Sequence, residues 1–316
     1  MSHHTGTEIN TDRLRLPLQK GVDTENIDHS LLQKAYNKYG PVPRNVYLAY
    51  SYPRRVVNHD DNTLKAIQNA SYAQLERVAR GGDRDASNKQ LICLRRRIPG
   101  AVCATVLSRF VAEKLLKAEA FANLHEKRRL LRLFTAIPQM GVARGWLFEA
   151  YAHNRLSSFS DPTESIDPTE GITLYTLAPI SEQSGEYQPD LNSATANLLF
   201  PLVDRTVYML TNDFTDEPAR GEAYHIPSIK NNLGFDSFLI TADAVYIFQM
   251  TVSCTHTADT DTQKGLHFLG KILPQDVHWH YVLVVPPTPN VSSVTLTSVS
   301  KEWVDAVESF RLLVLQ

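Results

Sequence analysis

The polar residues that could do chemistry gather around one predicted β-hairpin. The sequence from 236 to 251 consists of two apolar runs separated by a four-residue turn, so the runs are predicted to pair antiparallel. Direct pairing across the turn places Asp236 opposite Gln249, with both side chains on one face, and Thr251 two residues further along that face. Both faces are apolar over most of the hairpin, so these polar groups require hydrogen-bond partners or a chemical role.

These residues have two interpretations. In the structural one, Asp236 caps a loop, while Gln249 and Thr251 bind neighbouring backbone groups. In the functional one, all three belong to the end of an active site. The spacing of the residues agrees with both.

The helix predicted over 145–156 carries a second pair of polar residues. Glu149 and His153 are four positions apart and therefore share one face of that helix. A Glu near the beginning of a helix also interacts favourably with the helix dipole, which is the structural interpretation. In the functional interpretation, Glu149 faces the polar end of the hairpin, and His153 is a secondary candidate.

The sequence changes character near residue 140, from a helical part to a part rich in strands. We expect residues 1–30 to form a flexible arm, 31–138 a basic helical domain and 139–316 an α/β domain. In the first half, helices are predicted over 31–39, 62–80 and, as one or two helices, 101–133. In the second half, strands are predicted over 171–177, 206–210, 236–240, 245–253 and 279–285, and helices over 262–273 and 301–313.

Charge is unevenly distributed along the chain. Residues 1–150 contain 24 Lys and Arg against 14 Asp and Glu, whereas residues 151–316 contain 8 against 20. The basic half could meet nucleic acid, or the two halves could attract each other. The densest basic runs, each a candidate nucleic-acid contact or an ordinary solvated face, are Arg95, Arg96 and Arg97, and Lys127, Arg128 and Arg129.

Composition excludes several classes of protein. Three widely spaced cysteines form neither a disulfide scaffold nor a Cys-rich zinc module, and they suit a reducing compartment. No run of 18 apolar residues occurs and the first ten residues are polar, so neither a transmembrane helix nor a secretory signal is expected. The P-loop pattern Gly-x-x-x-x-Gly-Lys-Ser/Thr is absent. His278 and His280 have the spacing of metal ligands, without a third ligand nearby in the sequence.

Six short motifs occur in a fixed order along the chain. They are Tyr-Gly-Pro-Val-Pro-Arg (39–44), Gly-x-Leu-Phe-Glu-x-x-x-His-x-x-Leu (145–156), Asp-Ser-Phe (236–238), Phe-Gln-Met-Thr-Val-Ser-x-x-His (248–256), Gly-Leu (265–266) and Tyr-Val-Leu-Val-Val-Pro (281–286). Together they resemble the C-terminal region of the Crinkler and retrotransposon-hot-spot proteins. The resemblance is good over 141–286 and fair over 31–60.

This resemblance implies a PD-(D/E)XK nuclease-like domain over 139–316, with the restriction-endonuclease-like fold: an α/β mixed sheet flanked by helices. The mainly helical part before it would be the lid or winged-helix remnant of an ATPase. In the family, a helix Glu, a strand Asp and a Glu or Gln on the paired strand surround a magnesium ion. Those roles fall on Glu149, Asp236 and Gln249. Mg²⁺, or Mn²⁺, is the implied cofactor, and its preference for oxygen ligands agrees with these residue types.

One position departs from the family pattern. The family usually has a Lys two residues after the Glu or Gln, where this chain has Thr251, which cannot act as a cation. Lys264 and Lys271, in the following predicted helix, could reach back in its place, or could be ordinary solvated lysines. His256 could approach a phosphate or bind backbone. The absent P-loop implies a fragment or a degenerate copy of the family.

The resemblance predicts magnesium-dependent hydrolysis of DNA phosphodiester bonds by an effector that acts in a nucleus. The alternative is a catalytically inactive nuclease fold that binds nucleic acid or a host nuclear protein. DNA is the expected partner and no membrane association is expected. The oligomeric state is left open.

Overall fold

The computed structural model describes residues 28–39, 46, 50, 53–79, 91–98, 101–106, 108–121, 123–135, 141–157, 172–181, 184–196, 206–209, 222–227, 234–258, 260–274, 276–287 and 290–315. The chain divides into two compact units, Met1–Ala150 and Tyr151–Gln316. The division falls within helix α8 (Gly141–Ser157), whereas the sequence placed it between 138 and 139. Residues 1–27 of the expected arm lie outside the described residues, and the first described helix begins at His29.

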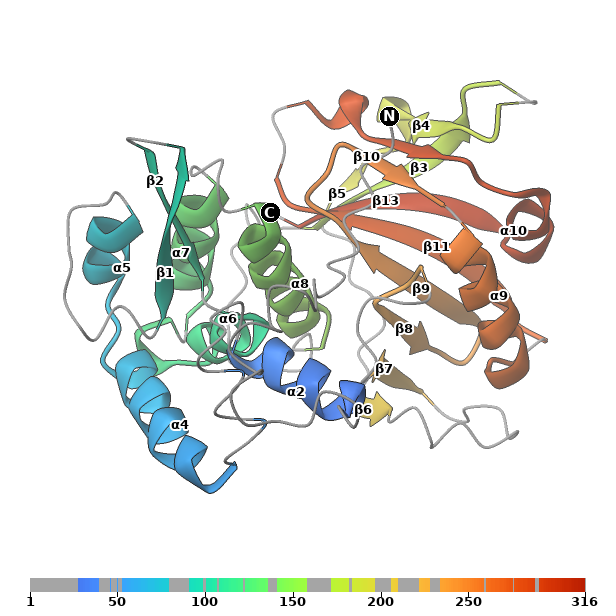
Figure 1. Ribbon diagram of the computed structural model, residues 1–316. Helices are drawn as coiled ribbons and strands as arrows, with labels where there is room; N and C mark the ends of the chain where they lie inside the picture. Colours follow the sequence, from blue (N-terminus) through green and yellow to red (C-terminus); the bar gives the residue numbers. More distant parts are fainter. Residues whose placement is uncertain are drawn as a thin grey trace. The chain divides into compact units, whose positions relative to one another are not determined.

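The first unit combines helices with a two-stranded hairpin (Figure 1). Within it, Lys38 joins three helices: its ammonium contacts Asp60 at 2.6 Å, and its carbonyl accepts a hydrogen bond from Ser108 at 2.7 Å. The described elements are α2 (His29–Tyr39), α4 (Pro53–Gln68), α5 (Tyr72–Ala79), β1 (Ile92–Ile98), β2 (Ala101–Val106), α6 (Arg109–Leu116), η3 (Glu119–Phe121) and α7 (Leu124–Thr135).

Two expected helices of the first unit differ in the structure. Residues 101–106 form strand β2, because they pair with β1 in an antiparallel hairpin that aligns Ile92 with Val106. The helix expected over 62–80 is two helices, α4 and α5. A reciprocal capping box begins α5: the Ser71 N–H donates to Gln74 Oε1 at 3.0 Å, and the Gln74 N–H donates to Ser71 Oγ at 3.4 Å.

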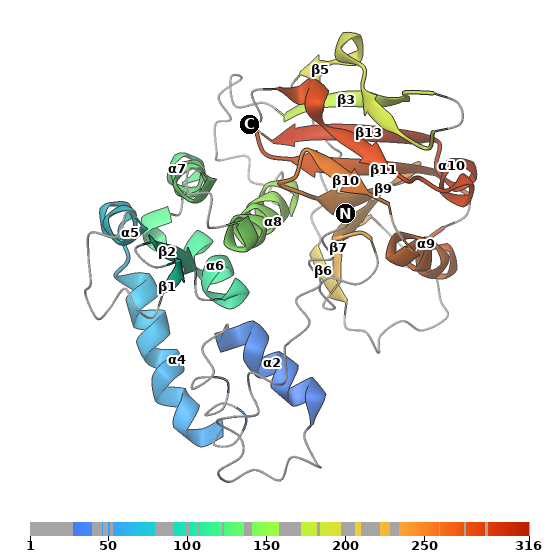
Figure 2. The ribbon, with the colours of Figure 1, turned by 45° about the horizontal axis from the view of Figure 1, so that its top comes forward.

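The second unit is built on one mixed sheet, with eleven strands among its described residues (Figures 1 and 2). The order across the sheet is β10-β12-β4-β3-β13-β11-β9-β8-β7-β6, with β5 paired to β3 off this path. The strands are β3 (Ile172–Pro179), β4 (Tyr187–Pro189), β5 (Thr195–Ala196), β6 (Thr206–Met209), β7 (Ala223–Pro227), β8 (Ser237–Ile240), β9 (Ala244–Met250), β10 (Thr255–Thr257), β11 (His278–Val285), β12 (Thr295–Thr297) and β13 (Ser309–Leu315).

Strand directions change along this sheet. β7, β8 and β9 form an antiparallel meander, whereas β9, β11 and β13 are parallel to one another. Helix α9 (Thr260–Ile272) makes the crossover between β9 and β11 that parallel neighbours require. The register of β8 and β9 pairs Ile240 with Val245 and Phe238 with Ile247, which confirms the pairing expected across the four-residue turn.

One face of the sheet packs against α9 and the short helix α10 (Lys301–Ala306). Leu269 of α9 and Trp303 of α10 belong to one buried apolar cluster with Phe238 and Ile247 of the hairpin. Burial of such side chains stabilises a fold by about 1.5–3 kcal/mol each. The hairpin that carries Asp236 is therefore anchored in the main core of the unit.

The helix expected over 301–313 is wrong beyond Ala306. Residues 309–315 form strand β13, which lies between β11 and β3. A short apolar run is compatible with either a buried helix or a buried strand, and here two neighbouring strands provide backbone partners. Strand β7 was also not expected, because it is short and follows a long stretch without a strand pattern.

Candidate functional site

The end of the β8–β9 hairpin joins Asp236 to Gln249 and to the backbone of Met250. Gln249 Nε2 donates to Asp236 Oδ2 at 2.9 Å, and the Met250 N–H donates to the same oxygen at 2.6 Å. The Asp236 N–H donates to the carbonyl of Phe248 at 2.8 Å. Asp236 and Gln249 are both half-buried. The structure therefore brings these two side chains together, as the hairpin register predicts.

Part of this arrangement is structural. β8 begins at Ser237, so the Asp236 carboxylate takes the place of a backbone carbonyl in receiving the Met250 N–H. Thr251 acts similarly, because its Oγ1 accepts the Ser253 N–H at 3.1 Å. These contacts agree with the structural interpretation of the sequence, and any chemical role must be compatible with them.

A hydrogen-bonded chain that the sequence did not predict ends beside Asp236. His153 Nδ1 lies 2.9 Å from the Tyr224 hydroxyl, which lies 2.8 Å from Ser237 Oγ. Tyr224 and Ser237 are both 0 % exposed, so their hydroxyls depend on one another for hydrogen bonding. The chain ties the last turns of α8 to β7 and β8. Its spacing from Glu149 makes His153 a candidate in the sequence, whereas Tyr224 lies on β7, whose sequence has no local strand signal.

Glu149 lies one turn before His153 on α8 and is half-buried. The helix begins at Gly141, two turns earlier, and the effect of a helix dipole falls off within the first turn. The dipole therefore does not account for this carboxylate. Glu149 belongs to the first unit and Asp236 to the second, and their participation in one site stays a prediction.

The two candidate lysines flank a contact between α9 and the hairpin. The ring of Phe268 stacks on that of Phe235, the residue before Asp236, with centroids 6.4 Å apart. Lys264 precedes Phe268 by four residues and Lys271 follows it by three, so both positions lie on the helix face of Phe268. Lys271 is exposed, whereas the side chain of Lys264 lies outside the described part of the chain.

The basic runs lie in the first unit. Arg95, Arg96 and Arg97 are consecutive residues of β1, and their side chains are outside the described part of the structure. Lys127, Arg128 and Arg129 lie on α7, where the first two are half-buried. Arg129 contacts Glu126 at 3.7 Å, and its guanidinium lies 3.7 Å from the centre of the Tyr72 ring. Arg129 thus contributes to packing between α7 and α5, and nucleic-acid contact by either run stays a prediction.

The donors at the hairpin end suit a hard metal ion. The described residues contain no group of three His, Cys, Asp or Glu side chains that could hold a metal ion. Asp236 and Gln249 supply oxygen donors, and Mg²⁺ keeps several waters and needs only one or two carboxylates. The residue types therefore fit magnesium.

His256 is half-buried on β10, where it pairs with Leu296 of β12.

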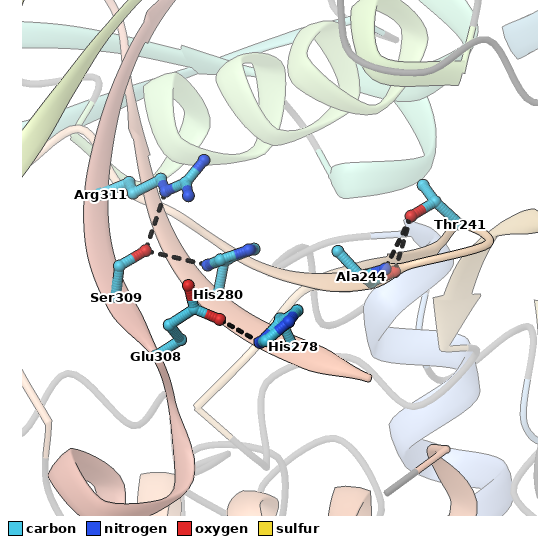
Figure 3. Close-up of polar contacts among 7 residues, drawn as sticks. All are labelled: Thr241, Ala244, His278, His280, Glu308, Ser309 and Arg311. Carbon is cyan, nitrogen blue, oxygen red and sulfur yellow. Dashed lines mark hydrogen bonds and ion pairs between the residues drawn. The ribbon is translucent and has the colours of Figure 1, made fainter. Parts of the chain in front are cut away.

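A second polar cluster lies where β11 and β13 begin (Figure 3). His278 Nδ1 contacts the Glu308 carboxylate. His280 Nδ1 lies 2.9 Å from Ser309 Oγ, which also accepts the Arg311 Nε–H at 2.9 Å. Burial, assisted by the Arg311 charge, lowers the pKa of His280 to about 4, so its ring is neutral at pH 7. Each histidine has its own partner, so the His-x-His spacing does not form a metal site here.

Comparison with known proteins assigns no family to the chain. No family model, curated protein or solved structure matches it. Of the helices in the described ranges, none is long and apolar enough to cross a bilayer. The functional argument therefore depends on the residues and their geometry.

Proposed function

We propose that the chain is a magnesium-dependent DNA phosphodiesterase with a restriction-endonuclease-like second unit. Asp236, Gln249 and Glu149 would hold the ion. The observation that carries this proposal is the contact between Asp236 and Gln249, 2.9 Å apart at the polar end of a hairpin anchored in the core. A carboxylate and an amide side chain in that position match the residue types implied by the Crinkler and retrotransposon-hot-spot resemblance.

The order of elements supports the same proposal. Helix α8 comes before the meander of β7, β8 and β9, with β3 to β6 between them, and the meander is followed by β10, by α9 and by β11 as the parallel neighbour of β9. A helix, a strand meander, a helix and a strand is the order that the resemblance implies for the nuclease domain. Asp236 lies directly before β8 and Gln249 lies on its partner β9, which agrees with the positions that the resemblance implies.

The spacing of the two side chains suits adjacent positions around Mg²⁺. A half-turn of the Gln249 amide would put its oxygen in the place of Nε2, which lies 2.9 Å from Asp236 Oδ2. Two ligands at neighbouring corners of an octahedron, each about 2.1 Å from Mg²⁺, are about 3.0 Å apart. The Met250 N–H can keep its bond to Oδ2 and so hold the carboxylate in orientation. When bound, magnesium would lower the pKa of a water and stabilise charge on the phosphate.

The remaining tasks fall to side chains near the hairpin end. Because Thr251 carries no charge, Lys264 or Lys271 would place a cation beside the scissile phosphate from the α9 face that contacts Phe235. The chain of His153, Tyr224 and Ser237 would keep the residue beside Asp236 in position.

The alternative is an inactive nuclease fold that binds nucleic acid or a host nuclear protein. Thr251 at the usual Lys position favours it, as does the use of the Asp236 carboxylate by the Met250 backbone. The resemblance places either activity in a nucleus. The second unit carries an excess of negative charge, so most of the affinity for DNA without catalysis would come from the basic first 150 residues.

Plasmid nicking by the full chain in Mg²⁺ and in Mn²⁺ tests the proposal. Asp236→Ala should abolish cleavage, because the ion loses a carboxylate ligand. Asp243→Ala is the matched control, since Asp243 is exposed in the turn of the same hairpin and should leave the rate unchanged. Thr251→Lys should raise the rate by restoring a cation. Cleavage that persists in Asp236→Ala would show that the hairpin end is not the active site.

Gln249→Glu tests the metal site without an activity assay. A second carboxylate beside Asp236 Oδ2 should lower the unfolding temperature without Mg²⁺, because like charges at this distance repel. Added Mg²⁺ should then stabilise the variant more than wild type. An equal loss of stability with and without Mg²⁺, together with no nicking, would leave the binding module as the function.

A further inference from the structure

Arg311 is a half-buried arginine that forms no ion pair with a carboxylate in the described part of the chain. It lies on the inner strand β13, in a region with 20 Asp and Glu against 8 Lys and Arg. Its Nε donates to Ser309 Oγ at 2.9 Å, and its guanidinium lies 5.9 Å from the centre of the Tyr246 ring. Because no carboxylate of the described residues neutralises it, the guanidinium can attract an anionic ligand.

Ser309 and His280 hold the guanidinium in a fixed orientation. Ser309 Oγ receives the Arg311 N–H, so its own hydrogen is left for His280 Nδ1, 2.9 Å away. The His280 ring is neutral because burial and Arg311 lower its pKa to about 4, so its single proton is then on Nε2. Figure 3 shows the outer ends of Arg311 and His280 pointing away from Ser309, which lies between them. These outer ends present N–H donors only.

The neighbouring carboxylates are engaged elsewhere. Glu308 is directed at His278 and contacts its Nδ1 (Figure 3). Asp243 is exposed in the turn before β9 and accepts a hydrogen bond from Thr241 Oγ1 at 3.1 Å. Burial raises the pKa of Tyr246, and a side-chain hydrogen bond joins Tyr246 to Arg311, so the phenol lies at the guanidinium.

We propose that Arg311, with His280 and Tyr246, binds a phosphate group. The guanidinium fork matches two oxygens of an oxyanion, and its Nε is already oriented by Ser309. The guanidinium alone occupies both oxygens of a carboxylate in a bidentate pair. The His280 imidazole and the Tyr246 phenol add further donors, which the additional oxygens of a phosphate can accept. A phosphate is therefore the better match. The phosphate belongs either to a small molecule or to a nucleic-acid backbone.

This phosphate site is separate from the hairpin end that carries Asp236. Tyr246 and Gln249 are three positions apart on β9, so their side chains point to opposite faces of the sheet. Their positions are also about 10 Å apart along the strand. Phosphate binding is therefore independent of the proposed hydrolysis, and either can fail without the other.

Titration of the ¹⁵N-labelled full chain with inorganic phosphate at constant ionic strength tests this site. The Arg311 side-chain Nε–H resonance, assigned by its loss in Arg311→Lys, should shift saturably. The unfolding temperature should rise with phosphate but not with chloride. Arg311→Gln should lose the stabilisation, and Arg311→Lys should weaken binding about tenfold because it keeps the charge without the fork. Arg132→Gln, at an exposed arginine of α7, is the control and should retain the response.

A short oligodeoxynucleotide without terminal phosphates is the second probe and separates the two sources. A shift with inorganic phosphate alone assigns a small-molecule phosphate, and a shift with the oligonucleotide assigns a nucleic-acid backbone. Ser309→Ala leaves the Arg311 charge in place and should weaken binding by releasing Nε, with the circular dichroism spectrum unchanged. Absence of a saturable shift with both probes, or stabilisation that persists in Arg311→Gln, would overturn the site.

Discussion

Acid should destabilise the second unit through His280. The residue is 5 % exposed on β11, and burial together with Arg311 lowers the pKa of its imidazole from 6.5 to about 4. The unfolded chain takes up this proton near pH 6.5, whereas the folded chain does so only near pH 4. The contribution of neutral His280 to the free energy of unfolding is therefore fully present above pH 6.5, and this contribution is lost as the pH falls toward 4.

The size of the effect follows from this difference in pKa. At pH 4.5 the unfolded imidazole is almost fully protonated and the folded one mostly is not, which corresponds to a loss of about 2.5 kcal/mol. That loss is a large fraction of the roughly 5–15 kcal/mol that stabilises a typical domain. The other charged groups that act on His280 are Glu308 and Asp243, which oppose the lowering, and His278, which adds to it.

Urea unfolding at pH 7 and at pH 4.5 measures this effect. His280→Asn is the informative variant, because an Asn side chain can keep a hydrogen bond to Ser309 near the position of Nδ1 without taking up a proton. Tryptophan fluorescence reports on the right unit, since Trp279 and Trp303 are 6 % and 1 % exposed in it. Wild type should lose about 2.5 kcal/mol more than the variant between the two pH values.

The matched control is His267→Asn, at an exposed histidine of α9. It should unfold with the pH dependence of wild type, since folding barely changes the surroundings of an exposed ring. An equal pH dependence in wild type and His280→Asn would refute the assignment of the acid sensitivity to His280.

Two further substitutions test the packing of the second unit. Tyr224→Phe should lower the free energy of unfolding by about 1–3 kcal/mol, because it removes the partner of the buried Ser237 hydroxyl. In urea unfolding, Ser237→Ala should cost less stability in the Tyr224→Phe background than in wild type. Gly185→Ala should destabilise by more than about 1 kcal/mol, since Gly185 has a φ of +59° and an added Cβ would lie 2.8 Å from the Val299 carbonyl oxygen. In thermal unfolding, Gly270→Ala in α9 should instead be neutral or stabilising, because nothing lies within 4 Å of its added Cβ.

The hairpin was predictable because its information is local. A turn of four residues between two apolar runs fixes which residues face each other, so Asp236 and Gln249 could be paired from the sequence alone. The same local reasoning located α2, α9, β3 and β11 to within a few residues. The hydrogen-bonding role of the Asp236 carboxylate also follows from its place just before β8.

Strands β13 and β2 could not be found in this way. Residues 309–315 and 101–106 are short apolar runs, whose local pattern does not distinguish a helix from a strand. β13 is decided by partners distant in the sequence, as in the pairing of Arg311 with Thr176, whereas β2 pairs with β1 directly before it. The phosphate-site residues were missed for the same reason, because His280 and Ser309 become neighbours only through the parallel register of β11 and β13.

The position of β13 also has a consequence for synthesis of the chain on the ribosome. β3 is synthesised before the other described strands of this unit, yet it pairs with β13, the last of them in the sequence. Thr173 of β3 pairs with Val314 of β13. Until residues 309–315 emerge, β3 and β4 cannot join β11 and β9, and the edges of both halves stay open to other chains. The second unit should therefore complete its fold only once residues 309–315 have emerged, and a nascent chain stopped before residue 309 should depend on chaperones to avoid aggregation.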